Sequence, residues 1–299
     1  IVFNGNFTRQ DLGTLINNGG GFGISGTLDL SGDELATDGT WYLTDDAMVK
    51  GGVLRDGTRI AVSYLLGRRG TLDGVTIDGT VSVGESVQLT ITDGNINGHG
   101  IVLIGGTALE GPAVLKSGIA TLTISKDMTV RGGGASFLGN DAPYISASRV
   151  ENYGTLRSAV SGGSLDGGGF IFNHGAVAVD AGAKLTAGSM RFDTDSILSI
   201  AKPTSTSQAA LSLVGTLDLS SLSDNLELTS PESWPLQVHY LIAHSASITG
   251  TFNHVTDNFA VQYTGTDIFV WRAFVPEPGV IGLVPAVAIL RRRRRASGR

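Results

Sequence analysis

Two pairs of aspartates are the residues of this chain whose type and spacing come closest to a catalytic arrangement. Asp45 and Asp46 are adjacent, and Asp193 and Asp195 are separated by Thr194. Clustered carboxylates cut polysaccharides by acid–base chemistry and also bind calcium. Residues two apart on a strand face the same side. The second pair therefore predicts two carboxylates on one strand face, with ordinary loop aspartates as the alternative.

A polysaccharide lyase would also need a basic side chain beside its acids. The candidates are Arg55, Arg59, Arg68 and Arg69. They could serve only if the fold aligned them with an acid cluster.

Metal and nucleophile chemistry have little support in the sequence. The five histidines are His99, His174, His239, His244 and His254. His239 and His244 lie five apart, which places them on opposite faces of a regular strand, so surface or turn roles are expected rather than a shared metal. The run 162–166 fails the calcium-binding glycine repeat, and common hydrolase, phosphate-loop, zincin and dinucleotide motifs are absent. We expect a non-enzymatic protein with no catalytic residue, metal ligand or cofactor.

Composition favours an all-β fold with an acidic surface. The 299 residues include 43 glycines and no cysteine, so disulfides and thiol nucleophiles are excluded. Six of the 21 basic residues lie in 291–299, which leaves 15 basic against 27 acidic residues in 1–290, a net charge of −12. Such a body does not favour nucleic acid as a partner.

Any functional site in this chain must be positioned by short strands, because the sequence shows strand periodicity in short runs. Residues 74–83, 86–94 and 120–130 alternate apolar and polar side chains and are rich in β-branched residues. Convincing stretches with helical periodicity are absent. The sequence therefore predicts short strands separated by tight turns.

The turns recur at a nearly constant interval. Asp-Gly-Thr occurs at 38–40, 56–58 and 78–80, and the runs 152–156 and 173–177 lie 21 residues apart. Such glycines tolerate the positive φ of a sharp turn. A spacing near 20 residues suits one coil of a parallel β-solenoid, or β-helix, whose coils must stack to bury their inward faces. An antiparallel sandwich or barrel is the alternative, because the same dipeptides make hairpin turns.

The chain divides into three predicted parts. Residues 1–201 form the β-solenoid body. After the break AKPTSTSQA near 202–210, residues 202–273 hold longer, more aromatic runs, which predict an antiparallel cap over the open strand edges. Residues 274–299 form a tail of different character. The expected fold is all-β with a short apolar helix in the tail.

The tail joins three features in order. Val275, Pro276, Glu277 and Pro278 form an extended acidic motif, because proline denies the backbone helix and sheet hydrogen bonds. Residues 279–290 are an apolar run, which as a helix would span only about 18 Å of an about 30 Å hydrocarbon core. Five arginines follow: Arg291, Arg292, Arg293, Arg294 and Arg295.

Arginines after an apolar run halt translocation and stay on the cytoplasmic side. A permanent membrane anchor and a nucleic-acid-binding run are the alternatives.

This arrangement resembles the PEP-CTERM sorting signal over roughly residues 275–295. The resemblance implies that an exosortase processes the exported protein at the inner membrane, with 276–278 as the recognition motif, 279–290 as a transient transmembrane anchor and 291–295 as the stop-transfer signal. Segments 150–188 and 248–265 resemble passenger regions of autotransporter-type β-helical surface proteins.

Together the sequence predicts an exported structural or adhesive protein of the cell surface or extracellular matrix, in bacteria that make exopolysaccharide and biofilm, with exopolysaccharide as a further possible partner. A polysaccharide-active enzyme and a glycan-binding module with the same tail are the alternatives.

Overall fold

The computed structural model describes residues 1–15, 20–36, 39–44, 46–62, 68–105, 112–133, 142–221 and 223–273. These residues form an all-β structure without an α-helix; η1 (Gln10–Leu12) and η2 (Pro231–Ser233) are single turns of 3₁₀ helix. None of their helices is long and apolar enough to cross a membrane. The predicted apolar helix of the tail lies outside the described residues.

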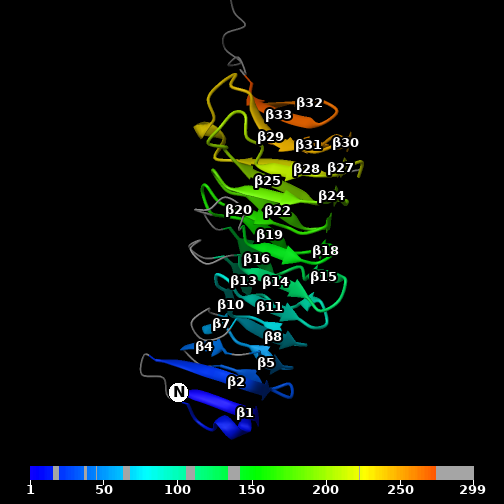
Figure 1. Ribbon diagram of the computed structural model, residues 1–299. Coiled ribbons are helices and arrows are strands. Elements are labelled where there is room, and N and C mark those ends of the chain that lie inside the picture. Colours follow the sequence, from blue (N-terminus) through cyan, green and yellow to red (C-terminus); the bar gives the residue numbers. More distant parts are fainter. Residues whose placement is uncertain are drawn as a thin grey trace, which may run out of the picture.

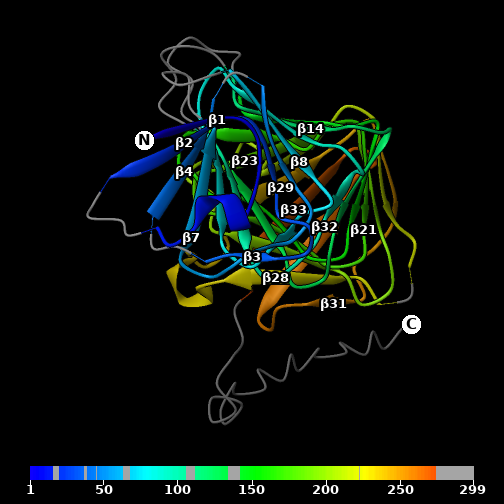
Figure 2. The same cartoon turned by 90° about the horizontal axis from the view of Figure 1, so that it is seen from below.

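The strands stack as coils along one long axis, from β1 at the bottom of Figure 1 to β32 and β33 at the top. Each coil contributes strands to three faces, and strands of successive coils overlie one another when the stack is seen end-on (Figure 2). Two long strands begin the stack. β2 (Gly21–Asp29) pairs with β1 (Val2–Thr8) and then with the first strands of two faces.

The first and second faces are continuous parallel ladders. The first face consists of β4 (Gly39–Leu43), β7 (Thr58–Val62), β10 (Thr80–Val83), β13 (Ile101–Ile104), β16 (Thr129–Gly132), β19 (Thr155–Ser158), β22 (Ala176–Val179), β25 (Ile197–Ala201), β28 (Asn225–Thr229) and β31 (His254–Val255). The second face consists of β5 (Ala47–Lys50), β8 (Arg69–Asp73), β11 (Gln88–Ile91), β14 (Val114–Ser117), β17 (Tyr144–Ser146), β20 (Ser164–Asp166), β23 (Lys184–Ala187), β26 (Leu211–Leu213) and β29 (Tyr240–His244).

The third face is formed by shorter strands. It consists of β3 (Glu34–Leu35), β6 (Val53–Leu54), β9 (Thr76–Ile77), β12 (Asn95–Ile96), β15 (Thr121–Ile124), β18 (Arg149–Asn152), β21 (Phe170–Asn173), β24 (Ser189–Phe192), β27 (Thr216–Leu219) and β30 (Ser247–Gly250). A single bridge between Thr76 and Asn97 connects its first three strands with the remaining seven.

Parallel pairing decides between the two predicted folds. Every strand pairing among the described residues is parallel except β29 with β33 (Asp267–Arg272) and β33 with β32 (Phe259–Tyr263). The antiparallel sandwich is therefore wrong for the body, and the mostly parallel stack is consistent with the predicted β-solenoid.

The antiparallel pairing at the C-terminal end is smaller than predicted. Parallel pairing continues beyond residue 202, through β26, β27 and β28 to β31, because their alternating residues bury the same inward rows as the preceding coils. Antiparallel pairing is limited to β33, which lies between β29 and β32 and runs opposite to both. The division of the chain at residue 202 stays a prediction.

The core is a set of inward rows that run along the stack. On the third face Leu122, Val150, Ile171, Met190 and Leu217 follow one another in register and are fully buried. Alternation along most of the strands sends every second residue into this core. Burying one such side chain contributes roughly 1.5–3 kcal/mol relative to its exposure.

The recurring turn residues have roles that the sequence only partly predicted. Gly57, in the second Asp-Gly-Thr triplet, has the expected positive φ of 86°. At Gly79, in the third triplet, the expectation of positive φ is wrong. There a Cβ would overlap the carbonyl oxygens of Thr58 and Arg55 in the preceding coil, so glycine is needed for close backbone approach.

Two asparagines 21 residues apart point inward at one corner of the stack. Asn152 donates a hydrogen bond of 2.6 Å from Nδ2 to Oδ1 of Asn173, and both side chains are fully buried. Asn152 also donates to the carbonyl oxygen of Ala176 at 2.8 Å, and Asn173 to that of Gly175 at 3.1 Å. The interval of 21 residues is thus one full coil, and each buried amide nitrogen finds backbone carbonyl acceptors at this corner.

Candidate functional site

The pair Asp193 and Asp195 does not present two carboxylates on one strand face. Both residues lie in the turn between β24 and β25, where Asp195 has a φ of 64°. Asp193 accepts a hydrogen bond from His174, Nδ1 to Oδ2, at 2.8 Å. The expectation is wrong because a left-handed turn residue breaks the alternation that strand geometry requires. Of the other pair, Asp46 has a φ of 61° in a turn before β5, and Asp45 lies outside the described residues.

The two closely spaced histidines have separate partners, but the expected opposite faces are not seen. Both side chains are exposed, and a register shift between Leu241 and Ala243 interrupts the regular alternation on which that expectation depended. The ring of His239 stacks on Trp271 with centroids 4.2 Å apart and planes 9° apart. His244 forms a hydrogen bond of 2.7 Å between Nδ1 and Oδ1 of Asp267. In the part of the chain that the structure describes, no group of three or more histidines and carboxylates is placed to hold a metal ion.

The four candidate arginines are spread over different parts of the stack. Arg55 forms an ion pair with Glu34. Arg59 lies on the first face beside Thr80 in the register, and Arg69 lies on the second face beside Gln88. Arg68 directly precedes Arg69, before the same second-face strand. The structure therefore does not bring these four arginines together at one place.

A cluster of rings lies on the outer side of the third face, which the sequence analysis did not predict. We name Tyr153, Phe172 and His174 the ring cluster. Tyr153 and His174 stack with centroids 4.4 Å apart and planes 4° apart, and Phe172 lies 4.8 Å from the His174 ring. Tyr153 and His174 hold equivalent places in the 21-residue repeat, so reading the repeat as a register would have found their contact.

Charged side chains surround the ring cluster. His174 lies between two carboxylates, with Nε2 3.0 Å from Oε2 of Glu151 and Nδ1 next to Asp193. The guanidinium carbons of Arg149 and Arg191 lie 5.1 and 5.0 Å from the centre of the Phe172 ring. These are the distances of cation–π contacts.

The same charges pair with one another across coils. Arg149 forms an ion pair with Glu151, and Nε of Arg191 lies 3.7 Å from Oδ2 of Asp218. The backbone N–H of Thr194, and then His174, hold the pKa of Asp193 below its usual value. Burial raises the pKa of Asp218, but hydrogen bonds from Ser220 and Thr249 outweigh it and the pKa is lowered. Both carboxyls are therefore ionised and held in place near neutral pH.

Asp224 is a buried carboxyl at the corner before β28. Its side chain is fully buried, and neither carboxylate oxygen has a hydrogen-bond partner of good geometry among the described residues. Burial raises its pKa to about 6, more than the nearby Ser221 lowers it. The carboxylates of Asp218 and Asp193 raise it further.

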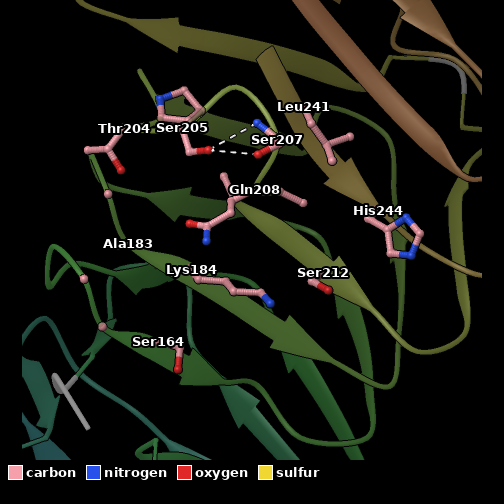
Figure 3. Close-up of a pocket in the computed structure, with 16 residues that line it drawn as sticks. Ser164, Ala183, Lys184, Thr204, Ser205, Ser207, Gln208, Ser212, Leu241 and His244 are labelled. Atoms are coloured by element: carbon pink, nitrogen blue, oxygen red, sulfur yellow. Dashed lines mark hydrogen bonds between the residues drawn. The ribbon is translucent and has the colours of Figure 1, made fainter. Parts of the chain in front are cut away.

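A groove of about 590 Å³ lies on another side of the stack, where the segment 203–210 passes over β20, β23 and β26 (Figure 3). Its polar lining is made of hydroxyls, amides and a few basic groups: Ser164, Lys184, Thr204, Ser205, Ser207, Gln208, Ser212 and His244. Among the described residues that line it there is no Asp or Glu.

The groove contains a serine and a histidine, the residue types that many hydrolases use as nucleophile and base, but the two are not hydrogen-bonded to each other. Ser212 and His244 are neighbours in the register, and His244 is oriented by Asp267. Ser212 makes no hydrogen bond to His244, however, and a nucleophile needs its base within reach.

No protein-family model, curated protein or solved structure matches this chain. The sorting motif Val275, Pro276, Glu277 and Pro278 and the arginines 291–295 lie outside the described residues.

Proposed function

We propose that this chain is an exported structural or adhesive protein of the bacterial cell surface or extracellular matrix. The observation that carries the proposal is the parallel backbone pairing, which passes from β1 through β2 and the first face to β31 without a break. Each coil covers the strand edges of the one before it, so the body is a hydrogen-bonded rod with a continuous core. Such a rod performs its function by spacing and display.

The finer parts of this proposal extend the observed fold. The body is a parallel β-solenoid closed by β32 and β33, and the tail carries a short apolar helix. Pairing of β33 with β29 supports the cap, because it covers the edge of the last parallel strand of the second face.

The tail determines where the rod is delivered. Pro276, Glu277 and Pro278 form the motif that an exosortase recognises, and residues 279–290 hold the protein transiently in the inner membrane. The arginines 291–295 stop translocation. What supports this is the order of an extended acidic motif, an apolar run and a cationic end. The transmembrane anchor is temporary, and the processed rod leaves for the surface or matrix, with no cofactor and no role for nucleic acid.

A polysaccharide-active enzyme on the same scaffold is the weaker alternative. It would need several carboxylates and a basic group converging on one groove. Asp193 instead pairs with His174, and the groove of Figure 3 has no acidic lining among its described residues.

The test is to express the full gene in cells with and without the exosortase and to compare molecular mass and membrane retention. With the enzyme, the wild-type chain is expected to be shortened and released from the inner membrane. A chain lacking residues 276–278 is expected to stay at full length in that membrane. Glu232→Gln is the matched control, because Glu232 also follows a proline but belongs to the exposed turn η2 of the body.

Two results would overturn the sorting proposal. One is a mature wild-type chain that still carries Arg291 to Arg295 when the exosortase is present. The other is equal processing of the deletion, the Glu232→Gln variant and the wild type.

A further inference from the structure

Tyr153 presents an open aromatic face on the third face of the stack. It follows β18 and is 45% exposed, whereas large apolar side chains of the body are mostly buried. His174, one coil further along, covers one side of its ring at 4.4 Å. On the other side the neighbouring coil supplies Ser125, because Ile124 pairs with Asn152 and the next residues follow in step. A small side chain there leaves the second face of the ring uncovered.

Polar groups continue from the open ring toward the N-terminal coils. Ser125 donates a hydrogen bond of 2.6 Å from its hydroxyl to Oδ1 of Asn97. Beside them, Nδ1 of His99 lies 3.2 Å from Oδ1 of Asp78. Within the described residues, the amide nitrogen of Asn97 and the hydroxyl of Tyr153 make no hydrogen bond. The amide can therefore donate to a ligand, and the hydroxyl can donate or accept. We name the ring of Tyr153, backed by His174, the aromatic wall, and we name Ser125 and Asn97 beside it the polar floor.

The wall is held rigid by contacts that cross several coils. His174 is fixed at both ring nitrogens, by Asp193 and by Glu151. Glu151 in turn pairs with Arg149, which also packs on Phe172. A ring that is already fixed loses little conformational entropy when it binds, so this network lowers the cost of binding.

We propose that the open face of Tyr153, with Ser125 and Asn97 as its floor, binds a sugar unit of a neutral polysaccharide. A pyranose has an apolar C–H face that packs on an aromatic ring, while its hydroxyls reach amides and hydroxyls at the edge. Charge selects against acidic glycans. The arginines near the wall are paired with Glu151 and Asp218, and residues 1–290 carry a net charge of −12. A polyuronate would be repelled, whereas a neutral chain is not.

This inference goes beyond the proposed function and does not depend on the sorting tail. Affinity electrophoresis of the purified full chain, residues 1–299, tests it in native gels. The gels contain a soluble neutral β-glucan, a neutral α-glucan or mannan, or a polyuronate. Retardation by at least one neutral polysaccharide is expected. Any retardation by the polyuronate, to which Arg291 to Arg295 offer positive charge, is expected to be the same in the wild type and in the Tyr153→Ala variant.

Variants then locate the site. Tyr153→Ala is expected to weaken binding by about 2- to 10-fold, the value of one aromatic stacking contact, and Tyr153→Phe to retain most of it. Tyr144→Ala is the matched control, because Tyr144 is 36% exposed on β17 of the second face. It is expected to bind like the wild type.

Three results would overturn the proposal. They are no retardation by any of the neutral polysaccharides, tighter binding to the polyuronate that is lost in the Tyr153→Ala variant, or equal loss of binding in the Tyr153→Ala and Tyr144→Ala variants. Thermal unfolding by circular dichroism confirms that each variant is folded. Since no exosortase is involved, failure here leaves the sorting proposal intact, and failure of processing leaves this one intact.

Discussion

Replacing Asp224 with asparagine should remove a pH-dependent loss of stability. The Asp224 carboxyl is fully buried, without a hydrogen-bond partner of good geometry in the described part of the chain, and burial raises its pKa from 3.8 to about 6. The folded state therefore holds this proton more tightly than the unfolded state. Its contribution to stability is complete below about pH 4 and is lost as pH rises through about 6.

The magnitude follows from the shift. A difference of about two pKa units corresponds to roughly 3 kcal/mol between the two ends of this range. The amide that replaces the carboxyl in the Asp224→Asn variant carries no charge, so this dependence disappears. The free energy of unfolding of the variant minus that of the wild type should rise by up to about 3 kcal/mol from pH 4 to pH 7.5.

The assay is urea unfolding followed by tryptophan fluorescence at intervals between pH 4 and pH 8. Taking the difference in the free energy of unfolding between the variant and the wild type cancels the contributions of carboxyls that lie far from Asp224. Asp218 and Asp193 do not cancel fully, because their charges act on Asp224. Asp257→Asn is the control, since Asp257 is exposed in the turn before β32. A difference for Asp224→Asn that stays constant with pH, or matches that of Asp257→Asn, would refute the reasoning.

Three further predictions test the coil contacts. Asn173→Ala should lower the free energy of unfolding by about 1–3 kcal/mol, measured by urea unfolding, because the fully buried Asn152 and the carbonyl of Gly175 each lose one hydrogen bond. Gly79→Ala should destabilise the protein by about 1–3 kcal/mol in the same assay, because its Cβ would meet a carbonyl oxygen of the preceding coil; unchanged stability would contradict that packing. His174→Gln should raise the pKa of Asp193, followed by carbon-13 NMR of its carboxyl. The pKa should still stay below 3.8, because the backbone hydrogen bond from Thr194 is the larger cause of its depression.

The sequence predicted the coils because corners and turns of the backbone require particular residues, and some of these residues recur at the length of one coil. The repeat that contains Asn152 and Asn173 places equivalent residues one coil apart, and the structure pairs them directly. Alternation in runs such as 86–94 also predicted which side chains are buried, since β11 buries Leu89 and Ile91.

The candidate site was harder to predict because it depends on which coils meet. The spacing of Asp193 and Asp195 suggested a shared strand face, but the positive φ of Asp195 places both in a turn. The extent of the antiparallel cap was overestimated for a related reason. The alternation of β27 and β28 is the same for parallel and antiparallel partners, so composition could not tell which strand pairs with which.

The position of the ring cluster argues that it is there for binding rather than for folding. The stack at this point is stabilised by inward residues, and Val150, Ile171 and Met190 are all fully buried beneath the cluster. An outward residue of a solenoid strand needs only to fit the extended backbone and to face water. Small polar residues meet this requirement elsewhere on the third face, as at Thr123 and Thr216. Tyr153 is half-exposed and stacks on His174, whose two ring nitrogens are hydrogen-bonded to Asp193 and Glu151, so it adds little to the buried core. It does provide a fixed apolar surface at a chosen place on a rigid rod, which an adhesive protein requires.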